Sequence, residues 1–493
     1  MRFPSLLFCD TPPERKNPEN VPEDLRLTLL LPQSVTPALC MPCGARDILA
    51  RQELLRALAS SDAGRAYFSA LSRDIDAVEG CYESFAAVRC DNERFLSYLG
   101  LVNAYHVFCR RAADAPELSG AGTLYTRFVR FFAELTASDA FRAMETELSA
   151  LYPYIDSIRE NRIRIRGSRL KVSAESPETF EDRLSRCARE LGFAEFSPAR
   201  DFTHAAAPQL IDAVAALYPK EFDAFRDFYR KNEAYFDVSL LGYRLELSFC
   251  IEITRLGDRI RKAGIPLTFP RIAQTKKIDI RNCYDITLLS KDETSIVPND
   301  VAFDEDAPFF YLTGANGGGK TTYLRTVGVA VLLFLCGCPI ACTDAEIYPL
   351  SGVYTHFPRD ERFDGDGRFA DEKKRVAEIH AVRGSDSLIL LNETYATTSE
   401  EIAVAETEKL ADELFASGCF GVYITHQHSL GQTRIPYLNV IVDSEDENRR
   451  TYKIARRKGV SGSYAKDILK KYALTREALD ARFPADADKG GNN

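Results

Sequence analysis

The residues best suited to chemistry lie in one stretch, which reads FFYLTGANGGGKTT from Phe309 to Thr322. An apolar segment leads into a run of glycines that ends in a lysine and a threonine, and this fits the G-x-x-x-x-G-K-[S/T] phosphate-binding pattern. Glycines let backbone N–H groups approach a phosphate chain where a Cβ would block them. The residues predicted to cradle the phosphates are Gly314, Ala315, Gly317, Gly318, Gly319, Lys320, Thr321 and Thr322.

Two of these side chains have separate predicted roles. Lys320 would supply a positive charge for the β- and γ-phosphates, and the Thr321 hydroxyl would bind Mg²⁺. A helix is predicted to follow, from Tyr323 to Leu335, and its positive end would point at the same anion. The pattern therefore predicts binding of ATP or GTP.

A second element could supply the hydrolytic chemistry. The apolar run from Leu388 to Leu391 ends in Asn392 and Glu393, as in a Walker B element. The first polar residue there commonly holds magnesium through water, and Glu393 could polarise the attacking water as general base. Asn392 stands where aspartate is usual, and its amide oxygen can accept a hydrogen bond but carries no charge. Weaker magnesium binding or slower turnover is therefore a hypothesis.

A histidine follows a later apolar segment. His426 comes directly after Thr425 and could reach the γ-phosphate, although a histidine by itself is more often structural than catalytic. Because His426 follows the phosphate-binding pattern and the Walker B-like segment in the usual order, a functional role is favoured.

These residues require elements that position them. From about Asp47 to Gly264 apolar residues recur at three- and four-residue steps, which predicts a helical region; the aromatic stripe between Phe222 and Tyr243 indicates core packing. After Pro266 the period changes. Strands are predicted at Lys277–Ile280, Ile286–Leu289, Phe309–Leu312, Ser387–Leu391 and Val422–Thr425, with helices at Asp371–Val382 and Glu401–Ala416.

Alternating strands and helices predict a mostly parallel sheet covered on both faces, with the glycine run at the carboxyl end of a central strand. The predicted fold class is α plus α/β. The predicted spans are an irregular lead-in (1–24), a helical domain (25–270), a nucleotide-binding domain (271–455), a helical C-terminal element (456–485) and a disordered tail (486–493).

One segment inside the helical region alternates strictly. Residues from Arg162 to Val172 place arginines and aliphatic residues in turn around Gly167 and Ser168, which predicts a short hairpin. Its basic face could contact a phosphate backbone, or it could be a solvated or salt-bridged face.

Bulk composition narrows the remaining possibilities. The 493 residues are 45% hydrophobic, and the net charge of −9 argues against general coating of nucleic acid while allowing a local basic patch. The longest apolar run, from Val327 to Cys342, contains Gly337 and Pro339, so a buried helix is predicted rather than a membrane span. Thirteen cysteines without an export signal predict a cytoplasmic location with reduced thiols.

The motifs together resemble the MutS family of DNA mismatch repair ATPases. TGANGGGKTTYLRTVG is similar to its phosphate loop, and Val297–Asp300 to its VPND element. The stretch from Thr355 to Glu372 is similar to the family's signature segment, LILLNETYATTSEE to its Walker B region and YITHQHSL to its histidine loop. Tyr452–Ile454 with Gly459–Tyr464 is similar to its closing segment.

The resemblance implies several roles. Asn316 would face the γ-phosphate, Glu393 would be the catalytic acidic residue, and His426 the late-loop histidine. ATP and Mg²⁺ are the implied cofactors, and a homodimer or a heterodimer with a paralogue is the implied assembly. ATP would then switch helical levers and their grip on DNA, and the closing helices would form a dimerisation element.

The departures from the family are specific. The lever-like helices begin by about residue 47, which leaves no room for the mismatch-reading and connector domains, so a short member is expected. Gly367 replaces the signature serine, Ile296 replaces an aromatic residue that often contacts the base, and the lever insertion is reduced to the hairpin. An ATP-driven protein-interaction switch that binds no DNA is therefore the alternative.

Overall fold

The chain divides into two compact units. A computed structural model describes residues 3–13, 17–88, 90–158, 162–166, 169–173, 208–291, 296–357, 376–377, 379, 386–394, 400–425, 434–442, 450–457 and 482. The helical unit comprises Met1–Asp10 and Arg56–Ile251, and the sheet unit comprises Thr11–Leu55 and Glu252–Asn493. Residues 25–55, which the sequence grouped with the helical region, thus pack with the sheet.

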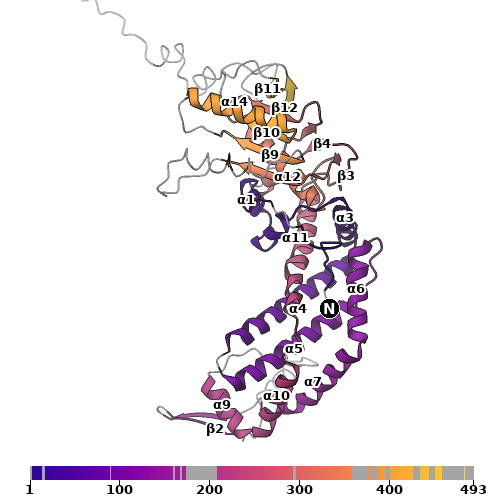
Figure 1. Ribbon diagram of the computed structural model, residues 1–493, viewed down its shortest axis with the longest axis vertical. Helices are drawn as coiled ribbons and strands as arrows, with labels where there is room; N and C mark the ends of the chain where they lie inside the picture. The colour runs from indigo at the N-terminus through magenta and orange to yellow at the C-terminus, as the bar shows by residue number, and fades with distance from the viewer. Residues whose placement is uncertain are drawn as a thin grey trace, which may run out of the picture. The chain divides into compact units, whose positions relative to one another are not determined.

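The helical unit consists of long α-helices (Figure 1). They are α4 (Asp62–Ala87), α5 (Asp91–Ala113), α6 (Gly122–Ala137), α7 (Asp139–Ile158), α9 (Pro208–Leu217), α10 (Pro219–Asn232) and the start of α11 (Tyr243–Lys262). The stretch from Phe222 to Lys262 is interrupted by the 3-10 helix η3 (Val238–Gly242). The Asp237 side chain accepts a hydrogen bond from the Ser239 N–H at 2.9 Å, which starts a new turn there.

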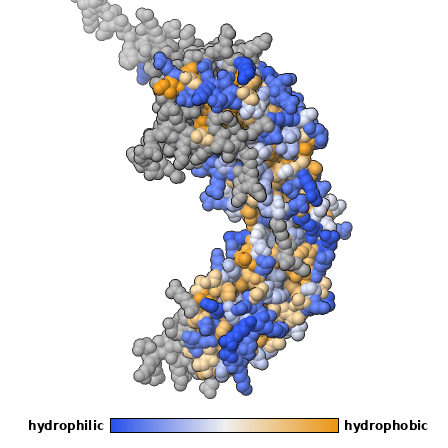
Figure 2. All heavy atoms as spheres, in the orientation of Figure 1, coloured by the Kyte–Doolittle hydropathy of each residue, from blue (hydrophilic) through white to orange (hydrophobic). Residues whose placement is uncertain are grey.

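Aromatic side chains form much of the core of this unit. Phe225 and Tyr243, two residues of the predicted stripe, are 0% and 3% exposed. The Tyr243 ring lies 5.2 Å from that of Phe128 and 5.8 Å from that of Phe108. The interpretation of the stripe as core packing is confirmed. Figure 2 shows hydrophilic and hydrophobic residues interspersed on the visible face of these helices.

The predicted hairpin is present in the backbone. Strand β1 (Arg162–Arg166) pairs antiparallel with β2 (Arg169–Ser173), and Arg166 lies opposite Arg169. Gly167 and Ser168, which the sequence placed in the turn, lie outside the described residues.

A six-stranded sheet forms the centre of the sheet unit, in the order β12-β11-β6-β10-β9-β8. Its strands are β6 (Phe309–Thr313), β8 (Gly352–His356), β9 (Ser387–Asn392), β10 (Phe420–Ile424), β11 (Tyr437–Val442) and β12 (Arg450–Arg457). All neighbouring pairs are parallel except β11 with β12. The prediction of a mostly parallel sheet is confirmed.

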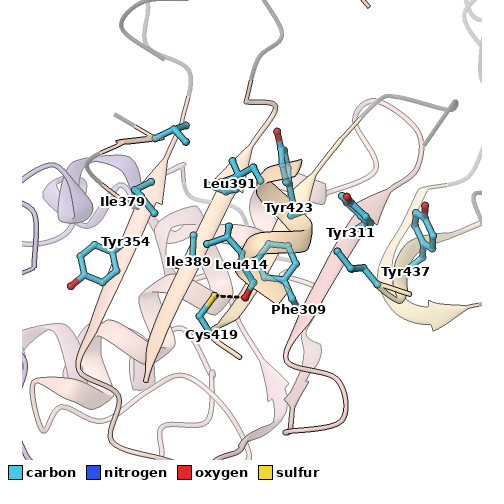
Figure 3. Packing of buried hydrophobic residues seen from close by; sticks show 14 of the residues in the cluster. Phe309, Tyr311, Tyr354, Ile379, Ile389, Leu391, Leu414, Cys419, Tyr423 and Tyr437 are labelled. Atoms are coloured by element: carbon cyan, nitrogen blue, oxygen red, sulfur yellow. Dashed lines mark hydrogen bonds between the residues drawn. The ribbon is translucent and has the colours of Figure 1, made fainter. Parts of the chain in front are cut away.

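Helices cover both faces of this sheet, because its strands are apolar on both sides. Helix α14 (Glu400–Ser417) packs Leu410 and Leu414 against Ile389 and Tyr423, and Figure 3 shows this cluster. On the other face lies α12 (Lys320–Leu335). A Cβ on its Gly328 would stand 2.7 Å from Leu390 Cδ1, so the helix and β9 approach closely there.

A second, four-stranded sheet was not predicted. Its order is β3 (Arg271–Ile272), β7 (Asp344–Ile347), β4 (Ile278–Cys283) and β5 (Asn299–Phe303). The strand predicted at Ile286–Leu289 is wrong: these residues begin the 3-10 helix η4 (Ile286–Lys291). Asp285 is 3% exposed and accepts hydrogen bonds from Thr287 N and Oγ1 at 2.9 and 2.7 Å, which favours a turn over an extended chain.

The segment after residue 16 packs tightly in the sheet unit. It contains α1 (Val21–Asp24), the 3-10 helices η1 (Leu27–Leu29) and η2 (Gln33–Val35), α2 (Thr36–Leu39) and the start of α3 (Ala45–Ser60). Leu25 is fully buried, and its Cδ2 lies 2.5 Å from where a Cβ on Gly328 would stand. Thr355 Oγ1 donates to Asp24 Oδ2 at 2.7 Å, which fixes α1 on strand β8.

Candidate nucleotide-binding site

The glycine-rich loop, residues 314–319, connects the fully buried strand β6 to α12. Gly314, Gly317 and Gly319 have φ values of +134°, +74° and +94°, where L side chains are strained. Gly319 is the residue before α12, so Lys320 is the first residue of that helix. The helix therefore directs its unbonded N–H groups at the loop, as the sequence predicted.

Strand β11 closes one side of this loop. A Cβ on Gly314 would lie 2.7 Å from Val440 Cγ2, and one on Gly318 would lie 2.9 Å from Val440 Cγ1. Thr313 Oγ1 donates to Asn439 Oδ1 at 2.8 Å, and both side chains are buried. Glycine is thus required at two positions by contact with β11, in addition to its conformational freedom.

The Lys320 ammonium lies inside the loop. Its Nζ donates to the carbonyl oxygens of Gly314 and Ala315 at 2.8 and 3.3 Å and lies 3.4 Å from Asn316 Oδ1. Burial lowers the pKa of Lys320 to about 8, and the negative charge of Glu393 acts in the opposite direction. The structure thus places Lys320, Asn316 and Glu393 in one electrostatic environment.

Asn392 and Glu393 follow directly at the end of β9. Asn392 is 8% exposed, and its Oδ1 has no hydrogen-bond partner among the described residues. Glu393 has φ of +52°, and its N–H donates to the Ile424 carbonyl at 3.1 Å. Since β6, β9 and β10 are parallel neighbours, their carboxyl ends bring Thr313, Asn392 and Thr425 to one edge of the sheet.

The oxygen donors at this edge fit a magnesium ion. The amide oxygen of Asn392 is buried without a hydrogen bond in the described structure, and the half-buried Thr321 lies in the first turn of α12. Mg²⁺ prefers oxygen ligands and keeps several waters, so few protein ligands are needed. The described residues contain no group of three or more His, Cys, Asp or Glu side chains that could hold a metal by themselves.

The structure describes only some of the other residues that the sequence singled out. Ala315 is 2% exposed, and Thr322 is half-buried in the first turn of α12. His426, Gly367 and the stretch from Tyr395 to Ser399 lie outside the described residues.

Tyr452 of β12 is a site residue whose role the sequence did not predict. Its side chain is 47% exposed, its φ is +55°, and its Cδ1 lies 3.4 Å from where a Cβ on Gly319 would stand. Asn299 holds it in place: Asn299 Nδ2 donates to the Tyr452 carbonyl at 3.0 Å, and Asn299 Oδ1 accepts from Ile454 N at 2.8 Å. The sequence indicates the motif that contains Asn299, but it carries no signal that β12 lies beside the glycine-rich loop.

A glycine-rich loop between a buried parallel strand and a helix, with polar residues at the same edge, defines the class of phosphate-binding α/β proteins. Residues 310–468 match the model of MutS domain V.

The described part of the chain contains no helix that is long and apolar enough to cross a membrane.

Individual relatives agree with that match. The chain is 26% identical over 246 residues to DNA mismatch repair protein msh-2 of Neurospora crassa, covering 45% of this chain and 25% of that protein. It is 29% identical over 221 residues to DNA mismatch repair protein MutS 2 of Halobacterium salinarum, covering 41% and 25%. DNA mismatch repair protein MutS 1 of Halobacterium salinarum is 38% identical over 142 residues, covering 28% and 16%.

These findings support membership of the MutS family. The alignments span a quarter or less of the length of these relatives.

Proposed function

We propose that this chain is an ATP-dependent DNA-binding protein of the MutS family. ATP binding and hydrolysis would switch a dimeric body of helical levers on mismatched, branched or otherwise unusual DNA. The observation that carries the proposal is the convergence of Lys320, Asn392 and Glu393 at the edge of the sheet where the glycine-rich loop lies.

The loop and Lys320 would hold the phosphates. The Lys320 ammonium donates to the loop carbonyls, and it would exchange these hydrogen bonds for phosphate oxygens when a nucleotide binds. Thr321 and Asn392 would hold Mg²⁺, which supplies charge neutralisation to the phosphate chain. The exposed ring of Tyr452 beside Gly319 offers an aromatic surface on which a base could stack.

Glu393 would accept a proton from the attacking water. Its backbone is fixed by the bond from its N–H to Ile424, and its charge is close enough to Lys320 to affect the pKa of that amine. Because Asn392 lacks the charge of the usual aspartate, slow turnover is expected.

The helical unit would act on DNA by analogy with the relatives, which are named as DNA mismatch repair proteins. Its long α-helices are compatible with contact with DNA, and so is the alternation of basic and aliphatic residues along β1 and β2. A homodimer, or a heterodimer with a paralogue, is part of the same proposal, with residues 456–485 as the dimerisation element and a cytoplasmic location.

The proposal is tested by measuring affinity for duplex, mismatched, branched and single-stranded DNA by fluorescence anisotropy. Each series is run with and without ATP and magnesium at two salt concentrations, because phosphate contacts make affinity fall with salt. Nucleotide-dependent binding to one structure is expected, and it should be absent in the Lys320→Ala variant.

The net charge of −9 favours one alternative, an ATP-driven protein-interaction switch. ATP binding without measurable affinity for any of the four DNAs would overturn the DNA-binding function and favour that alternative. Failure to bind ATP would contradict both functions.

A further inference from the structure

The turn that carries Glu393 is held by a buried chain of hydrogen bonds. Thr394 Oγ1 lies 3.1 Å from His356 Nδ1, and the Thr394 carbonyl accepts from the Tyr423 hydroxyl at 3.1 Å. The same Tyr423 hydroxyl lies 3.0 Å from Thr407 Oγ1. His356, Thr394, Tyr423 and Thr407 are 1%, 3%, 1% and 1% exposed. Buried polar groups in such a chain specify one geometry, because any other leaves them unsatisfied.

These hydrogen bonds support a backbone conformation that is otherwise unfavourable. Glu393 has φ of +52°, a conformation that a residue with a Cβ keeps only where its surroundings over-determine it. Thr394 is the next residue, and both its side chain and its carbonyl are bonded. The hydrogen bonds of Thr394 therefore oppose rotation of the peptide that follows Glu393.

His356 can serve as an anchor because strand β8 is itself fixed. It lies opposite Leu391 in the parallel pairing with β9. The preceding Thr355 donates to Asp24 at 2.7 Å, and the Val353 N–H donates to Asn17 Oδ1 at 2.9 Å. The following Phe357 lies under the Arg325 guanidinium, 5.2 Å from ring centroid to Cζ. Three successive residues at the end of β8 thus contact α1, the turn after β9, and α12.

We propose that His356 is a positioning residue for Glu393, acting through Thr394. The inference rests on the proposed function, in which Glu393 accepts a proton from water. His356 does not touch the reacting atoms; it fixes the turn on which the carboxylate stands. A general base must lie within hydrogen-bond reach of its proton, and misplacement by about 1 Å costs on the order of 100-fold in rate.

The substitutions that separate this role from simple packing are His356→Phe and His356→Asn. Phenylalanine keeps a ring of similar size and removes the hydrogen bond, whereas asparagine keeps a polar group near the position of Nδ1. We expect His356→Phe to lower the single-turnover rate of ATP hydrolysis about tenfold or more with unchanged ATP affinity. His356→Asn should keep the rate within about threefold of the parent.

The opposite end of the bond supplies a second pair of variants, which is informative even where His356→Phe does not fold. Thr394→Val removes the hydroxyl at nearly constant volume, and Thr394→Ser keeps it. Thr394→Val should slow hydrolysis as His356→Phe does, and the double variant should be no slower than either single one. In ¹⁵N-histidine spectra of the full chain, Thr394→Val should shift one imidazole nitrogen pair that Thr394→Ser leaves in place.

The outcomes that overturn the inference are distinct. Equal hydrolysis by the parent and His356→Phe would overturn it and leave the proposed function intact. Parallel losses of rate, ATP affinity and melting temperature in the Phe and Asn variants would assign His356 to packing alone. A parent protein that binds ATP without hydrolysing it would overturn both the inference and the hydrolytic step of the proposed function.

Discussion

Lys320 combines a buried amine with a role that requires its charge. Burial lowers its pKa to about 8, so part of the nucleotide-free protein lacks this proton at pH 8.5. A bound phosphate chain favours the charged form, and ATP binding should therefore take up a proton at pH 8.5. Affinity should fall as pH rises through about 8. Calorimetry in two buffers of different ionisation enthalpy measures the uptake.

The control for this proton is Lys320→Arg, because a guanidinium stays protonated throughout this range. The variant should bind ATP without the uptake that distinguishes the parent. Equal proton uptake by both proteins at pH 8.5 would show that another group is responsible.

Asn392 is the second residue with a testable charge. Its buried Oδ1 lacks a hydrogen-bond partner among the described residues, and a carboxylate there would add a negative charge toward a metal-bound water. Asn392→Asp should lower the magnesium concentration needed for half-maximal ATP binding by about tenfold. Asn316→Asp adds the same charge in the exposed part of the loop and should weaken ATP binding instead. An unchanged magnesium requirement in Asn392→Asp would remove the metal role from this position.

Single residues were predictable where a motif names them and not where only tertiary pairing does. Lys320, Asn392 and Glu393 lie in contiguous patterns, and the structure brings them together at one edge of the sheet. Tyr452 and His356 come from β12 and β8, which are the two outermost strands of that sheet. Spacing along the chain gives no signal for such neighbours.

Helix α12 and the segment before the helical region pack through one glycine. A Cβ on Gly328 would lie 2.5 Å from Leu25 Cδ2 and 2.7 Å from Leu390 Cδ1. Gly328→Ala should therefore destabilise the sheet unit by roughly 1–3 kcal/mol, as over-packing of a core does. Urea unfolding, together with hydrogen exchange of the α12 amides, measures the change in the free energy of unfolding.

Gly80 supplies a matched control on α4, because no atom lies within 4 Å of where its Cβ would stand. Gly80→Ala should stabilise the chain by about 0.5–1 kcal/mol through helix propensity. Leu25→Ala in the Gly328→Ala background should recover part of the loss. An absence of coupling between positions 25 and 328 would contradict the packing described.

Elements were predicted well where the hydrophobic period was long or the strand was fully buried. Helix α14 and strands β6, β9 and β10 lie within one or two residues of their predicted bounds. The short apolar run at Ile286 was assigned the wrong type, because four residues cannot distinguish a strand from a helical turn. Strands β5, β7 and β8 carry mixed polar and apolar residues and gave no separate signal.

The two units contain buried titrating groups that respond to different pH ranges. In the helical unit, burial lowers the pKa of His106 to about 4, below its ordinary value of 6.5. The unfolded chain then binds the proton first, so stability is complete above pH 6.5 and is lost as pH falls toward 4. The loss is roughly 2–3 kcal/mol.

This acid sensitivity should appear as reduced hydrogen-exchange protection of α5 amides between pH 6.5 and 4.5. In His106→Gln the pH-dependent part of that loss should be smaller than in the parent. The same loss in both proteins would assign the effect to carboxyl groups instead.

Division into units was the least predictable property of the molecule. The chain passes between the units three times: after Asp10, after Leu55 within α3, and after Ile251 within α11. The change from helical to strand period near Pro266 lies beyond the last of these points, because the helical period of α11 continues to Lys262. In α3, likewise, the helical period runs on without a break although the residues before Arg56 belong to the sheet unit. A continuous helix carries no mark of the unit to which each of its turns belongs.

The hydrogen bond between Asp24 and Thr355 spans 331 residues of chain. During synthesis at about 5–20 residues per second, the N-terminal half of that contact leaves the ribosome tens of seconds before the other half exists. Residues 56–251 can meanwhile complete their own contacts. Through that interval Leu25 lacks the two elements against which it packs in the folded protein, helix α12 and strand β9.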